Sequence, residues 1–93
     1  MENLKYRVDN YLNENRFYEW NGVKYHHLAT IEMDNRKFVV YEALGERYIE
    51  ELAQSNVSDS QLTPDQLLYI EDDELWFKLF LIAGSEGLFD KIK

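Results

Sequence analysis

The dipeptide Asn21-Gly22 is the feature that most constrains what this 93-residue chain can fold into. It stands between two runs of aromatic and apolar residues, and an Asn-Gly pair in this setting favours a two-residue type I′ turn, because both turn positions need positive φ. The turn fixes the register and places Glu19 opposite Lys24, so opposite charges meet across the strands. The sequence therefore predicts an antiparallel hairpin here.

A second turn is predicted at Asp34-Asn35, since both residue types tolerate the left-handed conformation. A two-residue loop there places Glu32 opposite Lys37 and again matches opposite charges. The two hairpins together predict a three-stranded antiparallel meander. Its expected strands cover residues 16–20, 23–33 and 36–42.

Strand alternation assigns the residues of this meander to two faces, and the face richer in apolar residues is predicted to meet the helices. That richer face carries Tyr18, Trp20, Val23, Tyr25, Ala29, Ile31, Phe38 and Val40. The opposite face carries Phe17, His26, Leu28, Thr30, Val39 and Tyr41. We expect the long middle strand to bend near His26-His27.

Apolar residues at helical spacing predict helices on both sides of the meander. The first is expected over residues 2–13, and another over 46–54, where Gly45 has ended the third strand. Residues 63–66, Thr-Pro-Asp-Gln, have the cap and the first-position proline of a helix start. A final helix is predicted at about 73–83, with Leu88, Phe89 and Ile92 returning onto the fold after it.

These elements predict an α+β fold: a three-stranded antiparallel meander packed with an N-terminal helix and C-terminal helices, in a single domain over residues 1–93. The chain is 45% hydrophobic and 15% aromatic, enough for a core in so small a domain. It has no cysteine, which excludes disulfides and thiolate metal sites and favours a cytoplasmic location. We expect no signal peptide and no membrane span.

The negative charge is concentrated in one part of the chain. Residues 42–74 carry ten carboxylates and one cation, Arg47, for a net charge of −9, whereas the rest of the chain sums to +1. Such a directed charge favours a protein partner with a basic surface, and it repels phosphates, so we expect no direct nucleic-acid binding. The predicted partner-binding residues are Glu46, Glu50, Glu51, Glu71, Asp72, Asp73, Glu74, Phe77 and Leu81.

Phe77 and Leu81 belong to this set because the last helix is apolar nearly all round. One stripe is enough for the core, and these two residues lie together at i, i+4 on another face. A helix of this kind is either deeply buried or has a second partner. Both interpretations, core packing and an oligomer or partner surface, stay open from the sequence.

No residue pattern identifies a reaction, a cofactor or a metal site. His26 and His27 point to opposite faces of a strand, so they cannot chelate one ion unless a bulge intervenes. The acidic run 71–74 lacks the alternating ligands and the turn glycine of a calcium loop, and is typical of a charged helix start. Residues 84–87, Gly-Ser-Glu-Gly, are not a nucleophile elbow. We therefore expect no catalytic, cofactor or metal residues.

The stretch from His27 to Tyr41, followed by Ile70 to Trp76, resembles a family of small, acidic, uncharacterised bacterial proteins. The resemblance covers about half the chain, and the N-terminal part departs from the family's pattern. It implies short strands around a turn, a terminal acidic helix that contains a Trp, and a bacterial or phage origin. It also implies a strand at 46–54, where the periodicity predicts a helix, so both assignments stay open.

These features predict a non-catalytic protein-binding module. A small acidic inhibitor, of a phage or mobile-element type, that occupies a basic site on a target protein would combine the small size, the acidic segment and the spare apolar surface. One alternative is a structural homodimer that uses the apolar sheet face with Phe77 and Leu81. The other is a DNA-mimic inhibitor of a nucleic-acid-binding protein, and an enzyme is the least favoured class.

Overall fold

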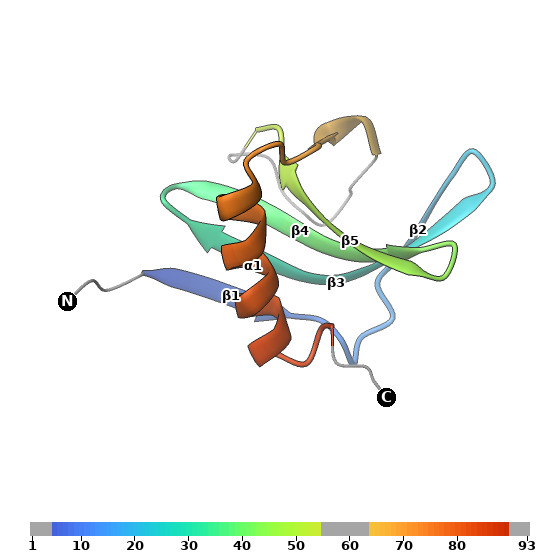
Figure 1. The fold of residues 1–93 in the computed structure, drawn as a ribbon. Helices are drawn as coiled ribbons and strands as arrows, with labels where there is room; N and C mark the ends of the chain where they lie inside the picture. Colours follow the sequence, from blue (N-terminus) through green and yellow to red (C-terminus); the bar gives the residue numbers. More distant parts are fainter. Residues whose placement is uncertain (1–4, 55–63, 90–93) are drawn as a thin grey trace.

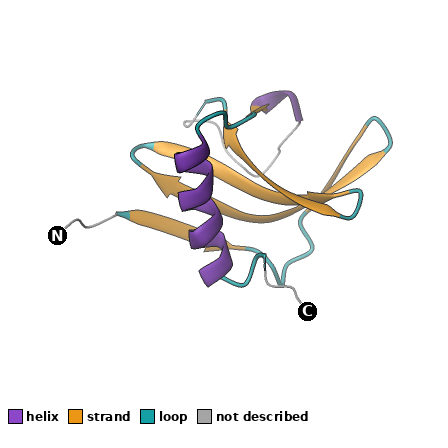
Figure 2. Ribbon diagram, in the orientation of Figure 1, coloured by secondary structure: helices purple, strands orange, loops and turns teal. Residues whose placement is uncertain are grey.

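The computed structural model describes residues 5–54 and 64–89, and this part of the chain is built around one antiparallel sheet (Figure 1). The strands are β1 Tyr6–Asn10, β2 Phe17–Trp20, β3 Val23–Met33, β4 Arg36–Ala43, β5 Glu46–Leu52 and β6 Leu67–Leu68. One turn of 3-10 helix, η1 Pro64–Gln66, precedes β6, and the helix α1 spans Asp73–Ser85. Figure 2 shows α1 crossing one face of the sheet.

The long strand β3 organises the sheet. One of its edges pairs with β4, and its other edge is shared by β2, which pairs with the first half of β3, and by β1, which pairs with the second half. Beyond β4 follow β5 and then β6, so the strand order is β1-β3-β4-β5-β6, with β2 paired to β3 off this path. Every pairing in this sheet is antiparallel.

Both predicted turns are confirmed. Asn21-Gly22 has φ values of 51° and 80°, and Asp34-Asn35 has 56° and 59°, which are left-handed conformations that these residue types adopt at low cost. A third turn of the same kind, Leu44-Gly45 with φ of 54° and 81°, joins β4 to β5. It turns the chain back onto β4, where the sequence predicted only the end of a strand.

The predicted registers of the two hairpins are also confirmed. Glu19 lies opposite Lys24, and Glu32 lies opposite Lys37. Two-residue loops leave no freedom in the pairing, so the turn chemistry alone determined which residues face each other.

A β-bulge in β3 between His27 and Ala29 reverses the alternation of its side chains. Before the bulge, Tyr25 faces the same side as Tyr41; after it, Ala29 and Ile31 face the side that α1 covers. The predicted division into two faces is therefore wrong, because it carried one two-residue period through the whole strand. The bulge does lie where a bend was expected.

The two faces of the sheet carry separate cores. Under α1, the buried helix residues Leu79, Ile82 and Ala83 and the returning tail residue Leu88 pack against Leu28, Ala29, Ile31, Met33, Phe38, Val40, Ile49 and Ile70. The core of the opposite face contains Val39, Tyr41, Ala43 and Leu52, bordered by Tyr18, Val23, Tyr25, Tyr48 and Leu67. The predicted return of the tail is confirmed for Leu88 and Phe89, while Ile92 lies outside the described residues.

The predicted N-terminal helix is wrong, because residues Tyr6–Asn10 form β1. Val8 and Leu12, two apolar residues at helical spacing in this range, both pack on the core under α1 from an edge strand and the turn after it. A helix of this length is marginal by itself, whereas the open edge of β3 supplies backbone partners. Residues 2–4 of the predicted helix lie outside the described part of the chain.

The predicted helix at 46–54 is also wrong, since Glu46–Leu52 is the strand β5. Tyr48 and Leu52 face one core and Ile49 faces the other, a spacing that fits a strand buried on both sides as well as a helix. The turn at Leu44-Gly45 decides between them, because it delivers the chain antiparallel onto β4.

The helix predicted to start at Thr63 is reduced to the single turn η1, after which the chain enters β6. Thr63 itself and residues 55–61, a polar stretch in which the sequence favours a loop, lie outside the described residues. The last helix is confirmed as α1. In the described chain, six strands and one α-helix thus replace the meander flanked by several helices, and the fold as predicted is wrong.

Candidate functional site

Strand β5 leaves part of its outer edge uncovered. Its inner edge pairs with β4 from Glu46 to Glu51, whereas β6 covers only Glu51 and Leu52 on the outer side. After Leu68 the chain leaves the sheet towards α1. Residues 46–50 therefore have no second strand partner within the described chain.

A groove of about 190 Å³ lies along this edge, between β5 and the first turns of α1, and we name it the β5 groove. Four consecutive residues, Arg47 to Glu50, line it, so residues of both sheet faces contribute and the groove follows the strand edge itself. Its other side is formed by Tyr69, Ile70, Asp73 and Trp76.

The β5 groove combines aromatic rings with carboxylates. Trp76 is 37% exposed and stacks on Phe80, with ring centroids 5.2 Å apart and an interplanar angle of 13°. Tyr69 is 79% exposed, and Glu50 and Asp73 supply the acidic groups. Aromatic faces attract cations through their quadrupole, and carboxylates form charge-assisted hydrogen bonds with ammonium and guanidinium groups. The lining therefore suits a lysine or arginine side chain.

A row of tyrosines orients the carboxylates beside the groove. Tyr25 and Tyr41 have ring centroids 5.5 Å apart, and Tyr41 and Tyr48 stack at 5.1 Å. The Tyr41 hydroxyl donates to Glu50 (3.0 Å), and the Tyr48 hydroxyl donates to Glu46 (3.2 Å). Burial, followed by the adjacent carboxylate, raises the pKa of both phenols.

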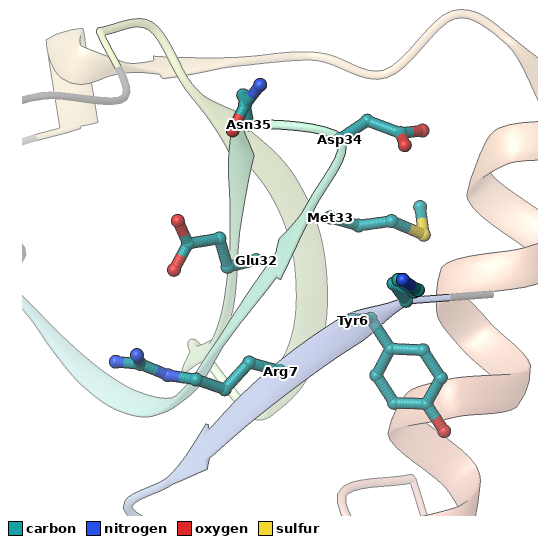
Figure 3. A pocket seen from close by; sticks show the side chains of 7 residues that line it. Tyr6, Arg7, Glu32, Met33, Asp34 and Asn35 are labelled. Carbon is teal, nitrogen blue, oxygen red and sulfur yellow. The ribbon is translucent and has the colours of Figure 1, made fainter.

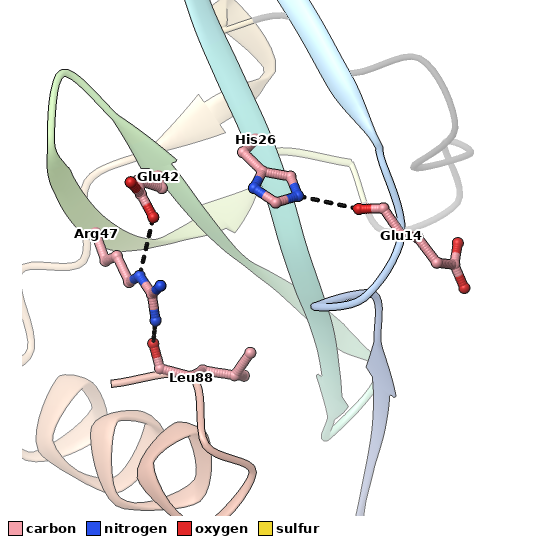
Figure 4. Close-up of polar contacts among 5 residues, drawn as sticks. All are labelled: Glu14, His26, Glu42, Arg47 and Leu88. Atoms are coloured by element: carbon pink, nitrogen blue, oxygen red, sulfur yellow. Dashed lines mark hydrogen bonds and ion pairs between the residues drawn. The ribbon is translucent and has the colours of Figure 1, made fainter. Parts of the chain in front are cut away.

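Arg47 lines the β5 groove, but its charge is already compensated. Its Nε donates to Glu42 at 3.1 Å, and its Nη1 donates to the backbone carbonyl of Leu88, as the dashed lines in Figure 4 show. The guanidinium therefore ties β5 to the tail after α1. Glu50 and Asp73 remain outside any ion pair of the described chain, which leaves the groove negative.

Of the predicted partner-binding residues, two line the groove and a third lies next to it on β5. Glu50 and Asp73 line it, and Glu46 lies on the same face of β5 as Glu50. Glu51 points to the other face and forms a bidentate pair with Arg36, with both N–O distances at 2.8 Å. This hydrogen bonding lowers the pKa of Glu51 and occupies its carboxylate.

The remaining predicted residues belong to α1 and its start. Asp72 is the N-cap, and its Oδ1 accepts from the backbone N–H of Glu74 (3.0 Å) and Leu75 (3.2 Å). Glu71 and Glu74 are exposed outside the groove lining. The outer stripe of α1 carries Phe77 and Leu81, which are 55% and 56% exposed.

Sequence reasoning missed Tyr48, Tyr69 and Trp76 as groove residues. Trp76 belongs to the last helix, whose apolar stripe was expected to pack on the core, and Tyr48 belongs to β5, where the periodicity predicted a helix. The signal that could have found them is the strand that the family resemblance implied at 46–54, because a strand there has an edge facing the helix start.

The two histidines serve the fold. His26 stacks on Phe17 at 4.3 Å, and its Nε2 donates to the carbonyl of Glu14 at 3.0 Å (Figure 4). His27 is buried, with Nε2 2.9 Å from the Thr30 hydroxyl. In residues 5–54 and 64–89, no three His, Asp or Glu side chains gather as metal ligands would. The expected absence of a metal stays a prediction.

A second hollow, of about 410 Å³, opens at the tip of the β3–β4 hairpin (Figure 3). Arg7 and Glu32 lie opposite each other in the β1–β3 pairing there, and Lys5 and Asp34 add one charge of each sign. The mixed charge of this open surface favours no single class of ligand.

Across the described ranges, no helix has the length and apolar character needed to cross a bilayer.

Comparisons of the chain with protein families, with curated proteins and with solved structures found no match. The geometry and charge of the β5 groove are therefore what indicate a function.

Proposed function

We propose that this protein is a non-catalytic protein-binding module whose β5 groove binds a basic segment of a partner protein. The observation that carries this proposal is the juxtaposition of Glu50 and Asp73 with exposed Tyr69 and Trp76 beside an uncovered strand edge. A lysine or arginine entering the groove would meet carboxylates and aromatic faces together.

The charge of the surrounding chain supports a basic partner. Residues 42–74 have a net charge of −9, and within them Glu42 and Glu51 are paired with arginines. The carboxylates outside such pairs create a negative potential around the groove, which raises the association rate of a positively charged partner.

Phe77 and Leu81 extend the proposed surface. Together with Asp73 they follow one stripe of α1 at four-residue spacing, and both side chains are more than half exposed. Apolar residues beside a charged groove supply contact area that electrostatic attraction alone does not. In this proposal they contact an apolar flank of the partner.

The biological role that such a module fits is that of a small acidic inhibitor, of a phage or mobile-element type, acting on a basic site of a cytoplasmic target. The DNA-mimic alternative is weaker for two reasons. Arg36 and Arg47 pair with Glu51 and Glu42, and the carboxylates of β5 point to both faces of the sheet. A mimic of a nucleic-acid backbone needs charges in a regular row.

The test uses a displayed library of random peptides selected on the purified protein. We expect the recovered peptides to be enriched in Lys and Arg. Their affinity should fall steeply as salt rises, because the Debye length shortens from about 10 Å at 0.1 M to about 3 Å at 1 M. Recovery of acidic or neutral peptides, or affinity that does not change with salt, would contradict the proposal.

A matched pair of variants tests the location. Asp73→Lys and Glu74→Lys change the net charge equally and at the same helix turn, but only Asp73 lines the groove. We expect Asp73→Lys to weaken binding of a selected peptide by about tenfold, and Glu74→Lys by about twofold, since short-range contacts add to the general field. Equal losses would place the binding site elsewhere.

A further inference from the structure

We propose that the partner segment enters the β5 groove as an extended strand, antiparallel to β5 and in line with β6. This inference rests on the proposed function and specifies how the basic segment is held. The segment would continue the outermost strand of the sheet beyond β6, which ends at Leu68.

The backbone of β5 provides the first argument. Its outer edge pairs with β6 only at Glu51 and Leu52, so the outward peptide groups of residues 46–50 have no strand partner in the described chain. Backbone N–H and C=O groups require hydrogen-bond partners, and an exposed edge is a template for another strand. Addition of a peptide strand to such an edge is a recurring mode of peptide recognition.

The groove provides the second argument. It is lined by consecutive residues of β5, so it runs along the edge and not across one face, and it is bounded by Tyr69 and Trp76. Its volume is about 190 Å³. A side chain of the added strand that points to the α1 side would fill this space beside Asp73.

The alternation of β5 specifies the sequence of the added strand. Glu46, Tyr48 and Glu50 point to one face, and Tyr hydroxyls hold both carboxylates there. Residues opposite these three positions share that face, so a complementary strand has a cation opposite each Glu and an apolar residue opposite Tyr48. The ligand is therefore an extended segment with Lys or Arg four residues apart and an apolar residue midway.

The same charges disfavour a second copy of this chain as the occupant. Two β5 strands paired antiparallel about Tyr48 would set Glu46 of each copy opposite Glu50 of the other. Like charges directly opposite each other destabilise a strand pair. A partner with basic residues at these positions fits the edge better than the chain itself does.

The experiment compares three synthetic peptides by titration calorimetry. Each has a Lys-Thr-Val-Thr-Lys core flanked by Ser and Thr; one is unmodified, one is N-methylated at the alternate amides that would face β5, and one at the amides that would face away. We expect methylation of the inward amides to weaken binding at least about tenfold, because hydrogen bonds to β5 are lost, and methylation of the outward amides to change it less than about twofold.

The register is tested by charge exchange. The double variant Glu46→Lys with Glu50→Lys should bind the lysine peptide more weakly, by about two- to fivefold for each charge, and should bind a Glu-Thr-Val-Thr-Glu peptide that the parent protein rejects. The exposed Glu14→Lys, between β1 and β2, is the control and should change neither affinity.

Three results would overturn the inference. Equal affinity for the two methylated peptides would rule out strand addition, while binding of all three would leave the proposed function standing. In a second result, all three peptides fail to bind while basic library peptides still bind Asp73→Lys more weakly than Glu74→Lys. That result would reject the extended segment and leave the proposed function standing. If the protein by itself sediments as a dimer, and the lysine peptide dissociates that dimer, the edge of β5 would be assigned to a second copy of the chain.

Discussion

Arg36 and Glu51 show how a single contact decides which carboxylates of an acidic segment are available to a partner. Glu51 is one of the ten acids in residues 42–74, but its two oxygens are held by one guanidinium. Asp72 is likewise committed to the start of α1. Charge reversal at either position would therefore disturb the fold, and Glu46, Glu50 and Asp73 are the residues that test binding.

The Arg36–Glu51 pair makes a prediction about pH. The pair lowers the pKa of Glu51 below its ordinary value of 4.5, so its contribution to stability is present above that value and is lost as the pH falls through the lowered pKa. Because the pair is partly exposed, we expect Glu51→Gln to reduce the free energy of unfolding by about 0.5 kcal/mol near neutral pH, measured by urea denaturation. The difference should shrink in acid, and a loss that is the same at both pH values would contradict this origin.

At the scale of elements, the turns were predictable and the pairing partners were not. Asn21-Gly22 and Asp34-Asn35 determine their hairpins through local backbone preference, which one sequence displays directly. The strands β1 and β5 form because an edge of β3 or β4 is available to pair with them, and this depends on the tertiary structure. The bulge after His27 lies between these cases, since a bend was expected there but its reversal of the two faces was not.

The hairpin turn can be tested by comparing two glycines. Gly22 has φ of 80°, so Gly22→Val forces a β-branched residue into the left-handed region and should reduce the free energy of unfolding by about 1–2 kcal/mol. Gly84 lies in α1, with no atom within 4 Å of an added Cβ, so Gly84→Ala should cause no loss of stability. Chemical denaturation of both variants measures the effect, and a Gly22→Val protein as stable as the parent would refute the role of the turn.

At the scale of the whole molecule, the acidic segment becomes a groove only through the fold. The sequence predicted Glu50 and Asp73 as binding residues from charge alone, although they are 23 positions apart in the chain. Their approach depends on β5 being a strand and on the chain leaving β6 after two residues to begin α1. The role of the aromatic residues follows from that arrangement and not from a local pattern, so only the strand that the resemblance implied at 46–54 pointed to them.

The most direct test of the β5 groove is a nuclear magnetic resonance titration of the isotope-labelled protein with the lysine peptide. We expect the largest backbone amide shifts at residues 46–50, with further shifts at Tyr69, Asp73 and Trp76, and slower hydrogen exchange along the outer edge of β5. Shifts centred on the hollow at the β3–β4 hairpin, or on β1, would contradict a binding site at the β5 groove.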